Sequence, residues 1–357
     1  LESSGAEIGR QLHSANLGNE QTFRHLREGV RDGGRRSARR ANLEQAACFA
    51  SLIEEQLGDF EGLTLKKKED EWKEFNVKVS NIVGTPLADV SKPFQGRTGA
   101  FKQIALTREG GTDASEEAVR NALDWIMRHQ LPDGGWSFNH TIGPGNRSTK
   151  NPGSLAEARN GATAMALLPF LGYGMVPTKE MLKSKDQKTR EWANCVERGI
   201  HFLTYVQPQN GKVKIANGMA DYTESGGRMY SHGLCAITLC EAYGMTHRKD
   251  YMPFAQMSLN FIVYAQDPVG GGWRYRPREA GDTSVVGWQV MALKSGHLAY
   301  LQVPPGTIKG AYRFLDSVQS DSGAAYGYTT PANGSATTAV GLLCRMYLGW
   351  KKDEPAY

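Results

Sequence analysis

The residues from about 116 to 350 repeat one pattern four times, and this repeat constrains the fold more than any other feature. In each copy a helix-forming segment ends at a glutamine, a turn follows, and a second, more apolar helix-forming segment comes next. The sequence therefore predicts four helical hairpins. The glutamines that mark them are Gln130, Gln207, Gln266 and Gln319.

The two segments of each hairpin predict different places in the fold. Each first segment carries its apolar and aromatic residues on one side, whereas each second segment is apolar or small nearly all round, as in a helix covered on both faces. Stacked side by side, such hairpins bury the second segments inside a ring of first segments. We therefore expect an all-α, double-walled helical barrel. The first segments are 123–138, 200–215, 259–275 and 312–328, and the second are 160–174, 232–245, 282–296 and 335–349.

The turns predict how each hairpin closes. The first and third copies place a glutamine, a run of glycines and Trp136 or Trp273 in the same order, and Tyr326 replaces tryptophan in the fourth. We expect the glutamine to bond the last free carbonyls of its own helix, and the glycines to take the left-handed conformation. The aromatic ring is expected to fold back over the glutamine. The second copy, with Lys212 and Ile215 and no such aromatic residue, is degenerate.

These segments resemble the QW repeats of squalene-hopene and oxidosqualene cyclases and the related repeat of protein prenyltransferase β subunits. They also look like the prenyltransferase and squalene oxidase repeat proteins of unassigned activity found in some bacteria, planctomycetes especially. The resemblance covers residues 116–350 and implies an α/α toroid. It further implies a central cavity that faces the N-terminal ends of the inner helices.

The chain divides into three regions by composition. Residues 1–112 are rich in charge, with an amphipathic helix expected over 41–57, and form an accessory region that the resemblance does not cover. The toroid is expected over 113–350 and a tail over 351–357. At the boundary, Thr112 or Ser115 is placed to cap a new helix.

The basic residues of the accessory region indicate which partners it could contact. Lys and Arg exceed Asp and Glu by 42 − 37 = 5, and much of the excess lies between Arg24 and Arg40. Because no aromatic residues are interleaved there for base stacking, we expect no nucleic acid partner. A solvated segment is the simplest interpretation, with association with a membrane or a protein as the alternative.

Several classes of site are not indicated. The five cysteines (Cys48, Cys195, Cys235, Cys240, Cys344) form no CxxC pair, and no histidines show metal-binding spacing. There is no phosphate loop, dinucleotide fingerprint or nucleophile elbow, so we expect no cofactor and no metal. No stretch is long and apolar enough to span a bilayer, and no signal peptide is visible. The chain is expected to be soluble as given, but it begins at Leu1, so an upstream leader or anchor leaves membrane association or export open.

Candidate site residues lie at the starts of the second segments, where free amides and the helix dipole favour polar groups. A cap or structural role is the simpler interpretation for each one. Together they are expected to line one mouth of the barrel, with aromatic residues suited to apolar or cationic ligands. The candidates are Arg159, Asn160, Tyr230, His232, Glu279, Asp282, Thr283, Ser335, Thr337 and Thr338, with Trp136, Trp273, Tyr275, Trp288 and Tyr326 as aromatic contacts.

The stretch "EAGDTSVVGWQ" tests both enzyme resemblances. The cyclases imply an Asp-Xaa-Asp-Asp-Thr motif, but Glu279 stands at its first position and Gly281 at that of the proton-donating acid. The prenyltransferases imply zinc on an Asp-Xaa-Cys motif, but Ser284 replaces the thiolate and no histidine follows His297. Asp282 is therefore expected first as a helix N-cap and second as a ligand contact.

Three functions stay open on this basis. The first is an enzyme or carrier that acts on an isoprenoid or another apolar molecule, with Asp282, His232 and Glu279 as candidate acid and base groups. The second is a non-catalytic toroid that binds protein or glycan. The third is a hydrolase or lyase of another toroid family. We place the first ahead, without claiming cyclisation.

Overall fold

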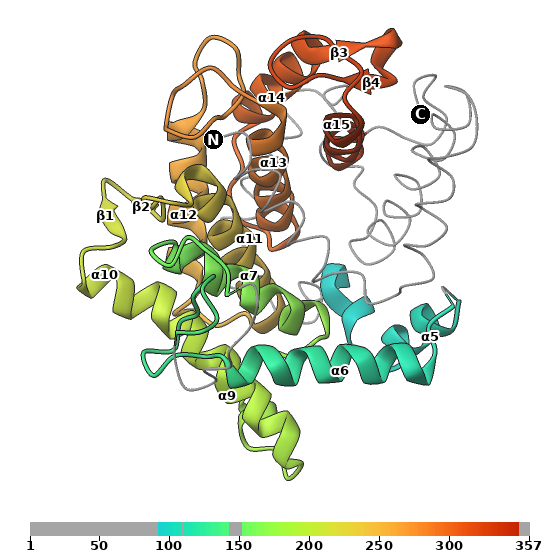
Figure 1. Cartoon of the computed structure of the whole chain (residues 1–357), viewed down its shortest axis with the longest axis vertical. Helices are drawn as coiled ribbons and strands as arrows, with labels where there is room; N and C mark the ends of the chain where they lie inside the picture. Colours follow the sequence, from blue (N-terminus) through green and yellow to red (C-terminus); the bar gives the residue numbers. More distant parts are fainter. Residues whose placement is uncertain (1–91, 109, 143–151, 350–357) are drawn as a thin grey trace.

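The computed structural model describes residues 92–108, 110–142 and 152–349 (Figure 1). These ranges are predominantly helical, with two short two-stranded sheets, so the all-α class is confirmed. Within them, no helix has both the length and the apolar character needed to cross a membrane. The predictions for the basic run from Arg24 to Arg40, the helix over 41–57 and the tail over 351–357 lie outside the described residues.

The hairpins form two rows of helices. The second segments become α7, α11, α13 and α15, which we call the inner row; α11 packs against α7 and α13, and α13 packs against α15 (Figure 1). The other helices form an outer row that packs against the inner row. In it, α9 contacts α7, α12 contacts both α11 and α13, and α14 contacts α13. The inner helices span Arg159–Gly172, Arg228–Thr246, Thr283–Leu298 and Ser335–Tyr347, and the outer helices α6, α9, α12 and α14 span Asp113–Arg128, Gln187–His201, Met252–Ala265 and Pro305–Val318.

Short elements connect the rows. They are η1 Lys92–Arg97, α5 Gly99–Arg108, α8 Lys179–Leu182, η2 Phe202–Val206, α10 Gln207–Gln209, β1 Lys214–Ala216, β2 Met219–Asp221, β3 Gln319–Ser320, η3 Asp321–Gly323 and β4 Ala325–Tyr326. β1 pairs antiparallel with β2, and β3 with β4. The predicted cap before α6 is confirmed, because Thr112 and Ser115 form a reciprocal capping box.

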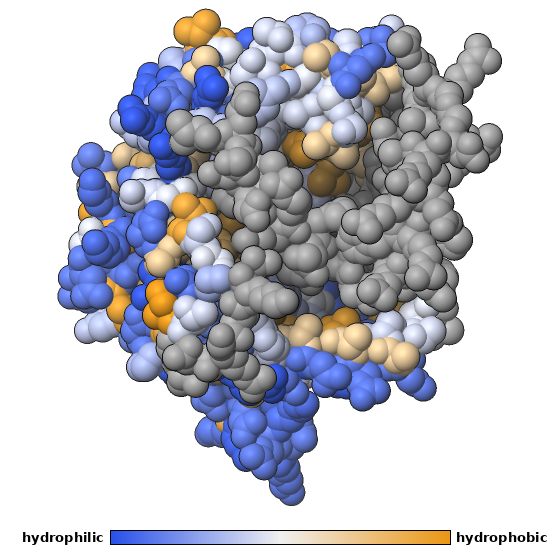
Figure 2. Space-filling model, viewed as in Figure 1, coloured by the Kyte–Doolittle hydropathy of each residue, from blue (hydrophilic) through white to orange (hydrophobic). Residues whose placement is uncertain are grey.

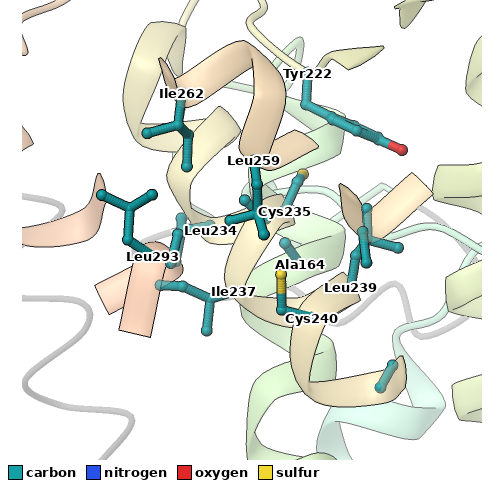
Figure 3. Close-up of a cluster of buried hydrophobic side chains, with 14 of the residues drawn as sticks. Ala164, Tyr222, Leu234, Cys235, Ile237, Leu239, Cys240, Leu259, Ile262 and Leu293 are labelled. Carbon is teal, nitrogen blue, oxygen red and sulfur yellow. The ribbon is translucent and has the colours of Figure 1, made fainter. Parts of the chain in front are cut away.

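The core lies between the rows and surrounds α11. Leu234, Cys235 and Leu239 of α11 are fully buried or nearly so, together with Ala164 of α7 and Leu293 of α13 (Figure 3). Leu259 and Ile262 of α12 close the cluster from the outer row (Figure 3). Because α11 is covered by three helices, its sequence has no polar face, as the repeat pattern predicted.

The repeat glutamines act across hairpins. Gln130 donates from Nε2 to the carbonyls of Gly134, in its own turn, and Cys195, in α9, both at 2.8 Å. Gln266 likewise donates to Gly271 at 2.7 Å and to Thr307, in α14, at 2.9 Å. The expectation that these glutamines bond the last carbonyls of their own helix was wrong for both. At Gln266 the backbone is already extended, with ψ of 137°, and the side-chain amide bonds the turn and the next outer helix instead.

The tryptophans, rather than the glutamines, donate hydrogen bonds to carbonyls near the end of their own outer helix. The indole Nε1 of Trp136 donates to the Ile126 carbonyl at 2.7 Å, and that of Trp273 donates to the Ile262 carbonyl at 2.8 Å. Both carbonyls lie four residues before the glutamine of the same copy. Each turn therefore bonds its own outer helix through tryptophan and the next outer helix through glutamine.

Glycine is required where the turn meets the next outer helix. Gly134 and Gly271 have φ of 90° and 81°, in the left-handed region. A Cβ on Gly134 would overlap the Arg198 carbonyl, and one on Gly271 would overlap the Gly310 carbonyl. Arg198 and Gly310 each lie three residues beyond the carbonyl that accepts from the glutamine. The first and third copies thus dock on their successors in the same geometry.

The second copy departs from this pattern, as predicted. α9 continues through the π-helical turn η2 into α10, and the β1–β2 hairpin replaces the glycine and tryptophan turn. β2 packs against α12, and Asn260 Nδ2 donates to the Gly218 carbonyl at 2.8 Å. Gln207 donates to Asn160 Oδ1 at 2.7 Å rather than to a carbonyl.

A buried ion pair ties η1 to the inner row. Arg97 Nη1 donates to Glu241 Oε2 of α11 at 2.7 Å, and both side chains are nearly fully buried. Ser295 of α13 donates to the other carboxylate oxygen at 3.2 Å. Phe94 packs against Gly244 in the last turns of α11. The segment before the first hairpin is therefore anchored toward the C-terminal ends of the inner helices.

The close approach of Gly271 predicts a large destabilisation by alanine. Gly271→Ala combines a left-handed backbone with overlap on the Gly310 carbonyl, so we expect the free energy of unfolding to fall by about 3 kcal/mol. Gly211→Ala is the matched control, because Gly211 has φ of 68° but no atom near the added methyl, and about 1 kcal/mol is expected there. Urea unfolding of both variants gives the comparison, and equal losses would contradict the docking geometry.

Candidate functional site

Each hairpin covers the start of the preceding inner helix. Three tyrosines recur at equal intervals, since 275 − 222 = 53 and 328 − 275 = 53. The Tyr222 carbonyl accepts from the Asn160 side chain at 3.3 Å, that of Tyr275 from Met229 N at 3.3 Å, and that of Tyr328 from Thr283 N at 2.9 Å. The sequence interpretation missed Tyr222 and Tyr328, although their spacing was a visible signal.

Asp282 is the N-cap of α13, as predicted. Its Oδ1 accepts from Val285 N at 3.0 Å and from Ser284 Oγ at 2.6 Å. Because the serine hydroxyl donates to the carboxylate, its oxygen accepts from the Tyr230 hydroxyl, 2.6 Å away on α11. A chain of hydrogen bonds therefore runs from Tyr230 through Ser284 to Asp282.

The second carboxylate oxygen of Asp282 accepts no hydrogen bond within the described residues. Asp282 is fully buried, and its Oδ2 lies 3.7 Å from Arg274 Nε, which also has no hydrogen-bond partner there. Burial raises the pKa of Asp282. Hydrogen bonding by Ser284, Val285 and Tyr328 and the positive charge of Arg274 oppose the rise. Asp282 Oδ2 and Arg274 Nε thus form an ion pair at a distance too long for a hydrogen bond.

Aromatic residues surround this ion pair. The Tyr275 and Tyr328 hydroxyls lie 2.6 Å apart, and the ring centroids of Tyr230 and Tyr275 are 6.1 Å apart. The guanidinium groups of Arg228 and Arg274 each lie 5.4 Å from the centre of the Tyr275 ring. Burial raises the pKa of Tyr230 and that of Tyr328, so both hydroxyls stay protonated at neutral pH. We call Tyr230, Arg274, Tyr275, Asp282, Ser284 and Tyr328 the tyrosine–aspartate cluster.

His232 does not pair with Asp282 or Glu279. It is fully buried, its Nδ1 accepts from Tyr222 N at 3.2 Å, and its Nε2 donates to the Ser258 carbonyl at 3.0 Å. Burial lowers the pKa of His232 to about 4, so the ring is neutral at pH 7. Both nitrogens are occupied by backbone groups, and the proposed acid and base couple is corrected to a structural histidine.

Arg159 and Asn160 also have structural roles. Arg159 donates to the Trp136 carbonyl at 2.7 Å and to both carboxylate oxygens of Asp133 at 2.9 Å. The Glu224 carboxylate, which the sequence interpretation missed, accepts from Asn160 N and Gly161 N at 2.8 Å and caps α7 from the next hairpin. Burial raises the pKa of Glu224. We assign Arg159 and Asn160 to turn and helix-end packing rather than to ligand contact.

Three further candidates are buried packing residues. Trp273, Tyr326 and Thr283 are fully buried. Their polar groups bond the Ile262 carbonyl, the Arg345 guanidinium and the Gly327 carbonyl, respectively. These partners leave them no free group for a ligand, so we assign them to packing.

The remaining candidates divide by position. Glu279 lies in the loop before α13, where its carboxylate accepts a hydrogen bond from Arg276 N at 3.2 Å. This bond involves no member of the tyrosine–aspartate cluster. Trp288 is half-buried one helical turn after Ser284 and therefore lies on the same face of α13. Thr337 and Thr338 bond the Tyr326 backbone, and Ser335 is exposed.

The cluster offers hydrogen bonding and aromatic contact. In the described ranges, no three His, Cys, Asp or Glu side chains form a group that could hold a metal ion. No protein-family model matches the chain, and no curated protein matches its sequence. Its function is therefore inferred from the chemistry of the cluster.

Neutral burial of His232 predicts a pH dependence of stability. Its pKa is about 4 when folded and about 6.5 when unfolded, so the unfolded state binds the proton first as the pH falls. The stabilisation is complete above pH 6.5 and declines toward pH 4. Between pH 7 and pH 5 the wild type should lose about 2 kcal/mol more than His232→Gln in urea unfolding. Parallel losses would contradict this, as would NMR detection of a His232 ring that protonates near pH 6.5.

Proposed function

We propose that the four hairpins form a squalene cyclase- and prenyltransferase-like α/α toroid that binds an isoprenoid or another apolar ligand at the N-terminal ends of its inner helices. The two rows of helices and the repeated docking of one hairpin on the next support this architecture. The resemblance of the repeat to those families supports the class of ligand. Binding, rather than cyclisation, is the function proposed.

One observation carries the proposal, namely the tyrosine–aspartate cluster at the start of α13 and the apolar face that continues from it. Ser284, Trp288 and Met291 follow one another at helical spacing, and all three are only partly buried. Figure 2 shows apolar residues gathered in a hollow beside α13 and α15. Aromatic hydroxyls at one end and apolar surface beyond them are typical of a site for a mostly apolar molecule.

The position of the cyclase proton donor is closed to an acid. Gly281 stands there, and a Cβ on it would lie 2.7 Å from the Gly272 Cα and 2.9 Å from the Phe314 ring. An aspartate therefore does not fit without moving the backbone of the preceding turn. Ser284, at the thiolate position of the zinc motif, is committed to hydrogen bonds with Asp282 and Tyr230.

The proposal predicts that the full chain retains apolar ligands. Native mass spectrometry of the gently purified protein should detect a bound lipid, and Trp288→Ala should reduce its occupancy several-fold by removing aromatic contact area. Trp125→Ala is the control, because Trp125 lies on α6 of the outer row and stacks on His129. Equal retention by both variants would contradict a site beside Trp288.

Two other results would overturn the proposed function. Conversion of squalene to hopene by the purified protein would establish a cyclase rather than a binding protein. Absence of any bound lipid, together with saturable binding of a glycan or a protein, would favour the non-catalytic alternative.

A further inference from the structure

We infer that a pocket on the outer row binds a phosphate group, free or as a small phosphate ester, through Arg128, Arg190 and Arg198. The pocket lies between the end of α6 and α9 and has a volume of about 400 Å³. No residue of the tyrosine–aspartate cluster lines it. This inference therefore goes beyond the proposed function and does not depend on it.

The three arginines of the pocket lack acidic partners. None of them forms an ion pair with a carboxylate within residues 92–108, 110–142 and 152–349. By contrast, Arg159 at the neighbouring turn is paired with Asp133 at 2.9 Å. Guanidinium groups that share one pocket repel one another. An anion between them removes this cost and also forms charge-assisted hydrogen bonds.

The charge of the lining matches that of a phosphate ester. The lining holds three arginines and one acid, Glu191, so its net charge is +2. The Glu191 carboxylate accepts from Gln187 Nε2 at 2.7 Å, one turn earlier on α9. A phosphate ester carries about −1.5 to −2 charges at neutral pH and three acceptor oxygens, whereas a carboxylate has one charge and two oxygens. The partial negative charge at the end of α6 opposes any anion, and three guanidinium groups outweigh it.

Backbone carbonyls hold two of the guanidinium groups in place. Arg190 Nη1 donates to the Ser184 carbonyl at 2.5 Å. Arg198 Nη2 donates to the Leu131 and Pro132 carbonyls at 3.0 and 3.2 Å. Each guanidinium group has five N–H donors, so these bonds leave donors for a phosphate. Because the two side chains are already held, binding costs them little further conformational entropy.

The pocket spans the joint between the first two hairpins. Arg128 belongs to α6, whereas Arg190 and Arg198 belong to α9. Gln130 also lines the pocket, and its side chain donates to the Cys195 carbonyl of α9. A phosphate held by arginines from both helices therefore strengthens the same joint that the glutamine makes.

The test measures the binding of three anions to the full chain by isothermal titration calorimetry at one ionic strength. Glycerol 3-phosphate presents a phosphate ester, inorganic phosphate presents the group alone, and succinate presents two carboxylates. We expect both phosphates to bind saturably with one site per chain and about tenfold more tightly than succinate. The tighter of the two phosphates identifies the source of the group, and either supports the site.

The variant Arg128→Gln removes one guanidinium group without breaking a bond within the protein. Arg128 forms no hydrogen bond or ion pair with any other described residue. Loss of its charge-assisted bond should weaken phosphate binding about tenfold. Arg120→Gln is the matched control, because Arg120 lies two turns earlier on α6, outside the pocket, and its replacement removes the same charge. Its affinity should match the wild type.

Thermal unfolding gives a second measurement. Glycerol 3-phosphate should raise the midpoint for the wild type and Arg120→Gln more than for Arg128→Gln, since a ligand stabilises the folded state that binds it.

Three outcomes would overturn the inference. Equal losses in Arg128→Gln and Arg120→Gln, or binding that does not saturate, would mean diffuse attraction to a basic surface. Succinate bound as tightly as the phosphates would assign the pocket to carboxylates. Absence of binding, with no shift of the midpoint, would mean that the arginines serve the packing of α6 and α9 alone. None of these results bears on the proposed function, which is tested at Trp288.

Discussion

The structure depends on one kind of contact, in which a glutamine side-chain amide bonds two hairpins at once. Gln130 and Gln266 each bond a carbonyl in their own turn and a carbonyl in the next outer helix. The left-handed glycines allow the turn to approach that helix without a Cβ between them. Tryptophan holds the turn to its own helix from the other side. These contacts join the turn after α6 to α9 and the turn after α12 to α14.

The candidate site follows from the docking of neighbouring hairpins. Once neighbouring hairpins are docked, the tyrosine loop of each reaches the start of the inner helix before it. Tyr230, Asp282 and Tyr328 come from three successive hairpins and meet at one place. No hairpin contains the cluster alone. The chemistry of the site is therefore a property of the stacking and not of one motif.

Local patterns in the sequence predicted the helices and their caps, because periodicity and capping are decided within a few residues. Asp282 and Thr112 cap helices as expected. Local patterns could not predict contacts between segments that lie far apart in the sequence. His232 was a candidate base until the Tyr222 and Ser258 backbones were seen to occupy both its nitrogens. Trp273 was a candidate ligand contact, but the same indole that suits a ligand also suits a turn, and only its partner separates the two roles. The toroid and its ligand stay proposals, because both depend on how all the hairpins are arranged together and not on local patterns.

The covering of each inner helix by the following hairpin has a thermodynamic consequence. Glu224 caps α7 from the second hairpin, and the Tyr328 carbonyl receives the Thr283 amide of α13 from the fourth. An inner helix that loses its successor exposes its first amides, so neighbouring hairpins gain stability from each other and open together. A molecule held among Tyr230, Asp282 and Tyr328 touches three hairpins and strengthens their mutual dependence. Occupancy of the site would then be felt as cooperativity along the array, far from the atoms that bind.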